Sequence, residues 1–290
     1  MSGPHVVAIG GGHGLAIVLK AVRSYADRVT AIVSTGDDGG SSGRLRQLLG
    51  VPAPGDLRRC LTAVSPDHEV AASFEHRFRH GDLAGHAVGN LLLAGLMDAG
   101  HDLAAAADLV AGWLGIDLDV MRVLPATSRP VHLVAETSGG VVRGQVDIER
   151  SSEVKHLAVD PADPPVPSAV SDAIEHDAHQ IVLGPGSFYA SVLAPSVVPR
   201  IRQALESRRG RLVFVSNLRA SEASVEGFDV ARHVAILREH GIRPDVVVAQ
   251  SEALPLGDLD GVEVVEADID RPHGLAHDPA LLGEVLATLI

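Results

Sequence analysis

Short aliphatic runs alternate with amphipathic segments near the start of the chain. Residues 5–9 form a β-branched run that ends at the glycine-rich stretch 10–14, and apolar residues then recur at helical spacing across 15–22. A second β-branched run follows at 29–33. This pattern predicts a β-α-β unit, in which the two strands are parallel and the crossover is right-handed.

The second half of the chain shows the same alternation. The predicted elements are a strand at 181–183, a helix at 197–205, a strand at 212–215, a helix at 230–239, strands at 246–249 and 262–265, and a helix at 280–289. Together with the first unit, these elements predict an α/β fold, namely a Rossmann-like, doubly wound, mostly parallel sheet.

The middle of the chain has a different pattern. Helical periodicity covers four segments, at 56–64, 67–80, 87–99 and 102–114. Four shorter pieces resemble strands, at 120–124, 131–135, 141–146 and 154–159, and a turn at 138–140 suits a hairpin. We therefore expect a single domain over residues 1–290, with an insertion of helices at about 50–115 and of antiparallel strands at about 120–160.

Composition and charge narrow the class of protein. The 290 residues are 46% hydrophobic but only 3% aromatic, and this mainly aliphatic composition suits buried parallel strands. The net charge of −13 argues against a general nucleic-acid-binding surface and against adhesion to an anionic membrane. No apolar run reaches the ~20 residues that cross a bilayer, and the N-terminus lacks the pattern of a signal peptide. We expect a soluble, cytoplasmic protein without nucleic-acid or membrane partners.

Four glycine- and hydroxyl-rich segments each follow a predicted strand. They are residues 10–14, 35–44, 184–187 and 216–217. In an open parallel sheet, ligands bind at the edge formed by the carboxyl ends of the strands. We therefore expect these segments to meet at one ligand-binding edge.

The first of these segments resembles a phosphate-binding loop, because backbone N–H groups at a helix N-terminus attract anions. Its residues are Gly10, Gly11, Gly12, His13 and Gly14. The segment matches neither standard fingerprint, since the dinucleotide pattern needs a small residue at Leu15 and a P-loop needs a lysine followed by Ser or Thr. The alternative is a tight strand-to-helix turn without a ligand.

The second segment places two adjacent carboxylates on a glycine-rich turn. Because burial of an unpaired charge is costly, Asp37 and Asp38 suit contacts with ribose hydroxyls, with Mg²⁺, or with an acceptor hydroxyl awaiting deprotonation. Arg44 is placed for a bidentate pair with an anion. The remaining candidates are Gly39, Ser41 and Ser42. The hydroxyls of the two serines suit contact with a phosphate or the cap of a following helix. The alternative is a solvated, capped turn.

Further candidates lie in the helical region. Asp56 is expected either to cap the helix that begins there or to contact a ligand, and Arg58 follows it. His86 and Asn90 are four residues apart and would share one helix face, as part of a core network or of a site wall. Cys60 is the single cysteine, which excludes an internal disulfide, and we expect it to be a packed, non-catalytic thiol.

The chain's histidines raise the question of a metal site. The pairs His76/His80 and His176/His179 have helical spacing but lack the His-Glu-x-x-His order of zinc proteases. We expect both pairs on solvated helix faces and predict no firm metal site, with Asp37 and Asp38 as the candidates if Mg²⁺ binds.

Five motifs resemble those of one known family. In chain order they are GGGHGL at 10–15, DDGGSSGRLR at 37–46, PGDLR at 54–58, GHAVGNLL at 85–92 and LGPGS at 183–187. They are similar to the CofD-like family, in its YvcK, or gluconeogenesis factor, branch. The resemblance spans residues 6 to about 217 and implies a Rossmann-like fold.

The resemblance implies two kinds of function. The YvcK branch is cytoplasmic, binds UDP-N-acetylglucosamine, and is linked to gluconeogenic growth, cell shape and cell-wall synthesis, with no established reaction. The CofD branch is enzymatic and transfers a phospholactyl-type group from a guanylylated donor to the deazaflavin Fo. The long run at 37–46 is similar to the YvcK side.

Each kind of function implies roles for particular residues. In a nucleotide-sugar-binding regulator, the loop at 10–14 would surround the ligand, while Asp37, Asp38 and Asn217 would fix hydroxyls. The second ligand loop consists of Gly184, Gly186 and Ser187. In a Mg²⁺-dependent transferase, Asp37 or Asp38 would hold the ion or activate an acceptor, while Arg44 and Arg58 would steady a phosphate. The regulator requires no cofactor, and homo-oligomerisation is left open in both cases.

The chain departs from the family pattern in three places. His13 stands where threonine is usual, residues 220–224 (Ala220–Ser224) replace a Gly-Glu-Thr segment, and Ala276 stands where a basic residue is typical. Without a cation at position 276, a diphosphate-sugar would bind more weakly, unless Arg271 or Arg243 supplies the positive charge.

Overall fold

Within the described residues, which are 3–220, 222–272, 274 and 276–290, the computed structural model has one seven-stranded parallel sheet. In spatial order its strands are β10 (Glu263–Ala267), β9 (Val246–Gln250), β8 (Arg211–Val215), β7 (Gln180–Leu183), β1 (His5–Gly10), β2 (Arg28–Val33) and β3 (Met121–Pro125). Neighbouring strands pair in parallel, as His5 with Arg28 and Val6 with Gln180 show. The predicted α/β fold with a doubly wound, mostly parallel sheet is confirmed.

The order of the strands reverses in the middle of this sheet. The chain runs outward from β1 to β3 on one side and from β7 to β10 on the other, so β1 and β7 are neighbours at a topological switch point. The carboxyl ends of strands at such a point leave a crevice in which ligands bind. The fold thus places the loops at 10–14 and 184–187 side by side.

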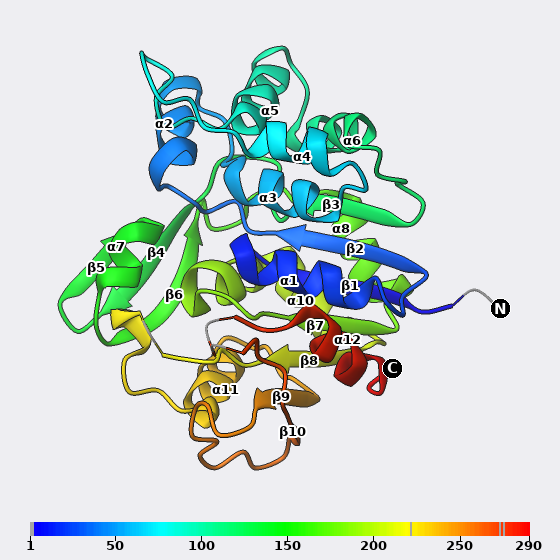
Figure 1. Cartoon of the computed structure of the whole chain (residues 1–290). Helices are drawn as coiled ribbons and strands as arrows, with labels where there is room; N and C mark the ends of the chain where they lie inside the picture. The colour runs from blue at the N-terminus through cyan, green and yellow to red at the C-terminus, as the bar shows by residue number, and fades with distance from the viewer. Residues whose placement is uncertain (1–2, 221, 273, 275) are drawn as a thin grey trace.

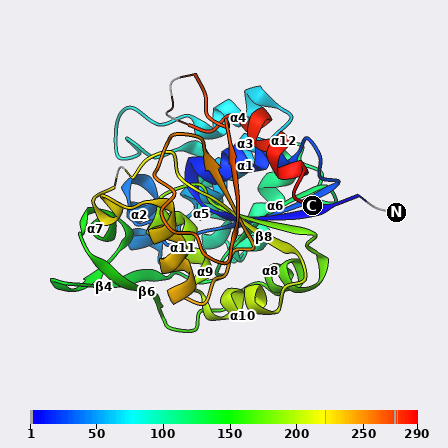
Figure 2. The same cartoon turned by 90° about the horizontal axis from the view of Figure 1, so that it is seen from below.

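Helices cover both faces of the sheet (Figure 1 and Figure 2). One face packs against α1 (Gly12–Val22), α3 (Gly55–Val64), α6 (Leu103–Trp113) and α12 (Pro279–Ala287), and the other against α10 (Pro199–Ser207) and α11 (Val230–Glu239). Val6 and Ala8 of β1 face the first core, whereas Val7 and Ile9 face the second. Burial on both sides explains why the strand is a continuous aliphatic run.

The helical region also contains α2 (Gly40–Leu49), α4 (His68–Glu75) and α5 (Val88–Asp98). The helix predicted at 67–80 is too long, because α4 ends at Glu75 and Arg77 instead forms a β-bridge with Ala87. His76 and His80 therefore do not share a helix face. His179 likewise lies beyond the π-helical turn η1 (Ala173–Asp177) that contains His176, so the predicted helix faces are wrong for both pairs.

The antiparallel insertion is smaller than predicted. Among the described residues it consists of β4 (His132–Thr137), β5 (Gly140–Arg143) and β6 (Val154–Asp160), in the order β5-β4-β6. The strand predicted at 120–124 does not belong to it, because β3 pairs in parallel with β2 in the main sheet. The strand predicted at 141–146 ends at Arg143, where Gly144 turns the chain at φ +105° into α7 (Gln145–Arg150).

The segment after β7 was not predicted. The loop at 184–187 enters a π-helical turn, η2 (Phe188–Leu193), which continues through α9 (Ala194–Ser196) to α10. The other short elements are α8 (Ser168–Asp172) and the 3₁₀ turn η3 (Ala223–Val225). None of the helices in the described part of the chain combines the length and apolar character that crossing a bilayer demands.

Candidate functional site at the switch point

Two glycine loops pack directly against each other at the carboxyl edge of β1 and β7. A Cβ added at Gly14 would overlap the carbonyl of Pro185, so the first turn of α1 touches the loop after β7 without intervening side chains. Gly12 has φ +58°, a left-handed conformation that favours glycine. The loop at 10–14 is therefore in close packing contact with the loop after β7 at the switch point.

Asp37 and Asp38 serve different purposes, although they are adjacent in the sequence. Asp38 accepts hydrogen bonds from the amides of Gln145 (3.0 Å) and Val146 (3.2 Å), and so it holds the first turn of α7. Asp37 Oδ1 accepts from the amide of Gly39 at 2.9 Å. Asp38 therefore joins α7 to the start of α2, whereas Asp37 stays within its own turn.

The partner of Asp37 at the crevice is Asp56. It does not cap α3 as proposed, because the helix begins at Gly55 with Pro54 as the cap residue, and no side chain caps it. Asp56 lies in the first turn, 9% exposed, with Oδ1 2.7 Å from Arg59 Nη1. Burial, reinforced by the charge of Asp37, raises the pKa of Asp56 to about 6, while Arg59 and the amide of Gly12 act in the opposite direction.

This carboxylate pair is also the candidate for a cation. In the part of the chain that the structure describes, no cluster of three or more His, Cys, Asp or Glu side chains has metal-site geometry. Mg²⁺ at Asp37 and Asp56 would therefore take most of its six oxygen ligands from a bound molecule and from water.

The two arginines assigned to phosphate each contact one protein group and keep other donors free among the described residues, including the buried Nε and Nη1 of Arg58. Arg44 donates to the carbonyl of Ala84 at 2.8 Å. Arg58 is 1% exposed, and its Nε lies 3.2 Å from Glu75 Oε1. A Cβ at Gly89 would come within 2.7 Å of Arg58 Cγ, so this side chain is packed among the helices. Arg59, which no motif singled out, is the guanidinium beside the first loop.

Ser41, His86 and Asn90 form one buried network. The Ser41 hydroxyl is 3.0 Å from His86 Nδ1 and accepts from Asn90 Nδ2 at 3.0 Å. His86 precedes α5 rather than lying on it, so the two predicted residues do not share a helix face. Their common hydrogen-bond partner supports the core-network interpretation. Ser42 packs instead against Gly55, next to Asp37.

The second loop is fixed by side chains that were expected to bind ligand. Asn217 accepts from the amide of Gly186 (3.0 Å) and donates to its carbonyl (2.8 Å). The hydroxyl of Ser187 lies 3.0 Å from Glu149 Oε1 and 3.1 Å from Glu222 Oε2, and burial raises the pKa of Glu222. Asn217 therefore positions the loop, and Glu149 connects α7 to it.

The positions that depart from the family pattern are spread over the molecule. His13 is exposed at the start of α1, and partial burial together with Arg59 lowers its pKa. Arg271 follows β10 at the carboxyl edge, where its amide donates to the carbonyl of Ala276 at 2.9 Å. Arg243 lies between α11 and β9, at the opposite edge, so it cannot replace the missing cation. Of the segment 220–224, Ser221 lies outside the described residues.

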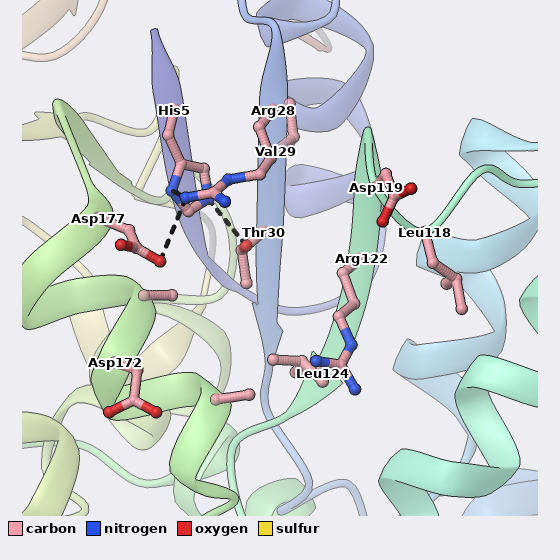
Figure 3. Close-up of a pocket in the computed structure, with 12 residues that line it drawn as sticks. His5, Arg28, Val29, Thr30, Leu118, Asp119, Arg122, Leu124, Asp172 and Asp177 are labelled. Atoms are coloured by element: carbon pink, nitrogen blue, oxygen red, sulfur yellow. Dashed lines mark hydrogen bonds and ion pairs between the residues drawn. The ribbon is translucent and has the colours of Figure 1, made fainter. Parts of the chain in front are cut away.

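A polar cavity of about 290 Å³ lies at the amino edge of β1, β2 and β3 (Figure 3). Arg28 and Arg122 point into it, and Arg28 lies 3.0 Å from His5 Nδ1 and 3.2 Å from Asp177 Oδ2. No glycine-rich loop lines this cavity. It is a separate region from the switch point and was not predicted.

Comparisons with known proteins agree with the fold and the motifs. Residues 6–276 match the sequence model of the family described as 2-phospho-L-lactate transferase CofD. The chain is 36% identical to a gluconeogenesis factor of Halalkalibacterium halodurans, with 86% of this chain and 78% of that protein covered. It is 39% identical to a candidate gluconeogenesis factor of Mycobacterium leprae, with 98% and 86% covered.

A solved structure extends this likeness to three dimensions. The crystal structure of a UPF0052 family member from Bacillus halodurans superposes with a TM-score of 0.92 at 31% sequence identity, over 99% of both chains. Sequence and structure therefore show that the chain belongs to the CofD-like family, in the branch of the gluconeogenesis factors.

Proposed function

We propose that the chain is a regulatory protein that binds a nucleotide-sugar of the UDP-N-acetylglucosamine type at the switch point between β1 and β7. The observation that carries this proposal is the direct packing of the glycine loops at 10–14 and 184–187, where Gly14 abuts Pro185. Glycine loops at this edge of an open parallel sheet let a ligand approach the backbone closely.

The side chains around these loops suit the parts of such a ligand. Carboxylates accept hydrogen bonds from sugar hydroxyls, and Asp56 lies beside the first loop, close enough to Asp37 for the two charges to interact. A diphosphate needs cationic or N–H donors, and His13 and Arg59 lie at the same end of α1. Arg271 lies on the same edge of the sheet.

The engagement of other polar groups supports binding rather than catalysis. The transferase hypothesis assigns Mg²⁺ or the acceptor to Asp38 and phosphate to Arg44 and Arg58. Asp38 instead holds the first turn of α7, Arg44 bonds to Ala84, and Arg58 is packed beside Glu75. Of these three residues, Asp38 and Arg44 therefore have protein partners, whereas Nε and Nη1 of the buried Arg58 hydrogen-bond to no group among the described residues.

One observation favours the alternative, a transferase of the CofD type. A carboxyl group with a pKa of about 6 accepts and returns protons readily near neutral pH, and Asp56 has this property beside Asp37. In that case Asp56 would be the group that deprotonates the acceptor hydroxyl of Fo, and Asp37 would help to hold Mg²⁺. The family description, 2-phospho-L-lactate transferase, is consistent with this alternative.

A ligand screen separates the two functions. Thermal unfolding should be followed with UDP-N-acetylglucosamine, UDP, GDP and Fo, each with and without Mg²⁺. A ligand present at 100 times its Kd adds about 2.7 kcal/mol to the free energy of unfolding. Stabilisation by the UDP-sugar without any group transfer to Fo supports the regulator. Transfer to Fo by the purified protein, or stabilisation only by GDP and Fo, contradicts it.

The proposal includes a cellular role in gluconeogenic growth, cell shape and cell-wall synthesis, controlled by the bound nucleotide-sugar. It is tested in a bacterial strain that lacks its own gluconeogenesis factor. The wild-type chain should restore growth on gluconeogenic carbon, and a folded variant that no longer binds the nucleotide-sugar should not. Equal rescue by both proteins would separate the cellular role from ligand binding.

A further inference from the structure

The second glycine loop carries a hydroxyl that lies between two carboxyl groups. Ser187 Oγ is 3.0 Å from Glu149 Oε1 of α7 and 3.1 Å from Oε2 of Glu222, the residue before η3. Glu149 Oε1 also accepts from Gln145 Nε2 at 3.0 Å, within the same helix. Three segments that are distant in the sequence therefore meet at one hydroxyl. We call Glu149, Ser187 and Glu222 the carboxyl clamp.

The hydrogen bonds of the carboxyl clamp do not balance when both glutamates are ionised. A serine hydroxyl has one proton to donate, and an ionised carboxylate can only accept. If Ser187 donates to Glu149, its oxygen faces Glu222 Oε2 at 3.1 Å, and a hydrogen bond there needs a proton on Glu222. A protonated Glu222 donates to Ser187, and Ser187 donates to Glu149. One additional proton thus satisfies both contacts.

The surroundings of Glu222 favour this proton. Burial, together with the charge of Glu149, raises the pKa of Glu222 above its ordinary value of 4.5, while Ser187 and the amide of Phe188 act in the opposite direction. The opposing effect of Ser187 is lost whenever its single proton is donated to Glu149. In the described part of the chain, Glu149 is thus the charged group that acts on Glu222, and it favours the neutral form.

The charge on the carboxyl clamp affects the ligand loop. When Glu222 is ionised, its contact with Ser187 becomes repulsive, so only α7 still holds the loop. The same helix is bonded to Asp38 through its first two amides, so it joins the loop after β7 to the loop after β2. A diphosphate near the loop also favours a neutral Glu222, because like charges repel. Both effects lower the affinity for an anionic ligand as pH rises through the pKa of Glu222.

We propose that the carboxyl clamp holds one shared proton, and that binding of the nucleotide-sugar takes up this proton from solvent and fixes the second glycine loop. Glu149 and Glu222 are then positioning residues, which act on the ligand through Ser187. This inference rests on the proposed nucleotide-sugar function and adds regulation by pH to the same site.

The shared proton is measured first in the protein without ligand. Carbon-13 NMR follows the side-chain carboxyl signals of Glu149 and Glu222 from pH 3 to 9, and Glu149→Gln and Glu222→Gln assign them. We expect one carboxyl group of the wild-type pair to titrate above the ordinary value of 4.5. In Glu149→Gln the second charge is absent and the new amide can donate to Ser187, so Glu222 should titrate nearer to 4.5.

The coupling to the ligand is measured by calorimetry with UDP-N-acetylglucosamine from pH 5 to 8, in two buffers with different heats of ionisation. This ligand lacks a phosphate monoester, which would itself lose a proton at about pH 6. Glu222→Gln keeps a donor beside Ser187 but cannot ionise. The matched controls are Glu226→Gln, in the same segment, and Asp147→Asn, in α7, both at exposed positions. Circular dichroism and thermal unfolding verify that each variant is folded.

We expect the wild-type Kd to rise 5- to 10-fold from pH 5 to 8 relative to the Kd of Glu222→Gln. Near neutral pH the wild type should take up about half a proton more per bound ligand than this variant. The titration of Asp56 cancels, because both proteins contain it. Glu149→Gln should behave as Glu222→Gln does, and the two controls should follow the wild-type profile within 2-fold.

Three results would overturn the inference. The first is a titration of both carboxyl groups at or below 4.5, and the second is the same pH profile and proton uptake in the wild type and in Glu222→Gln. The third is a displacement of both carboxyl signals by Mg²⁺ in the ligand-free protein, which would show that a cation joins Glu149 and Glu222. Each of these leaves the proposed function intact. A wild-type protein that binds no nucleotide contradicts the proposed function and its proton coupling, and the NMR titration then still shows whether the pair holds a proton.

Discussion

The two edges of the central sheet are both polar, but they differ in how their polar groups are paired. At the amino edge (Figure 3), Arg28 faces both His5 and Asp177, and His5 Nε2 lies 2.9 Å from Thr30 Oγ1. At the carboxyl edge, Asp56 faces a second carboxylate, Asp37, as well as Arg59. A cavity lined by charged residues is therefore not enough to identify a binding site. Two carboxylates held close together are a better indication, because a ligand or cation can offset their repulsion.

The comparison also extends to protonation, because each edge holds one buried group with a displaced pKa. Burial, and secondarily the charge of Arg28, lowers the pKa of His5 to about 4. Burial, and secondarily Asp37, raises the pKa of Asp56 to about 6. At pH 7 His5 is neutral, which is the form that its surroundings favour. Asp56 is ionised at this pH, although its surroundings favour the neutral carboxyl group. The folded state is therefore destabilised at the carboxyl edge at neutral pH, and at the amino edge in acid.

The largest effect should come from breaking the contact between the glycine loops. In Gly14→Ala the added methyl group overlaps the Pro185 carbonyl, so the backbones must separate. Overpacking typically costs about 1–3 kcal/mol, and a backbone clash belongs at the upper end or beyond. We expect about 3 kcal/mol of lost stability in denaturant unfolding and loss of nucleotide binding.

A matched glycine supplies the control for this variant. Gly112 in α6 has open space around it, so Gly112→Ala should stabilise the helix slightly. A Gly14→Ala protein with wild-type stability and affinity would show that the two loops are not in direct contact.

The second effect concerns the stability that the folded state loses when Asp56 ionises at the carboxyl edge. Because the pKa of Asp56 is raised from 3.8 to about 6 on folding, stability falls as pH rises between about 4 and 6, and the full cost applies above pH 6. The shift corresponds to about 3 kcal/mol. Asp56→Asn should therefore match wild type near pH 4 and be more stable by up to this amount at pH 7. Urea unfolding from pH 4 to 8 measures the difference, and a constant difference across this range would rule out the proposed penalty.

The third effect is the mirror image at the amino edge. The pKa of His5 is lowered on folding, so stability is lost as pH falls from 6.5 toward 4, where the unfolded chain binds a proton that the folded chain does not. By pH 5 this loss reaches about 2 kcal/mol. His5→Gln, which retains one donor and one acceptor, should reduce the loss between pH 7 and pH 5. An unchanged acid profile would mean that another group dominates it.

The same contrast between edges explains how much of the structure could be predicted. The strands β1 and β2 follow from β-branched runs that lead into glycine-rich loops, because such continuous apolar runs are typical of strands buried on both faces. The sheet to which β3 belongs depends on its pairing with β2, where Met121 lies opposite Val29. No local pattern specifies a partner more than 80 residues away, so the strand was assigned to the wrong sheet.

The candidate site shows the same limit at the level of side chains. Loops at the ends of strands were predictable, and the structure places them together at the switch point. The direction of each side chain was not, since Asp38 turns toward α7 and Asp56 turns toward the first loop. The turn η2 had no sequence signature, because a π-helical turn has no characteristic spacing of residues.

The smallest effect separates the two adjacent aspartates. Asp38→Ala removes the acceptor for the amides of Gln145 and Val146, and loss of such a cap costs about 1 kcal/mol. Hydrogen exchange of these two amides should accelerate, while the Kd for UDP-N-acetylglucosamine should stay within 2-fold of wild type. Asp147→Ala, in the same turn of α7, is the control and should change stability by a few tenths of a kcal/mol. A 10-fold loss of affinity in Asp38→Ala without faster exchange would assign Asp38 to the ligand and contradict the structural role that its contacts with α7 indicate.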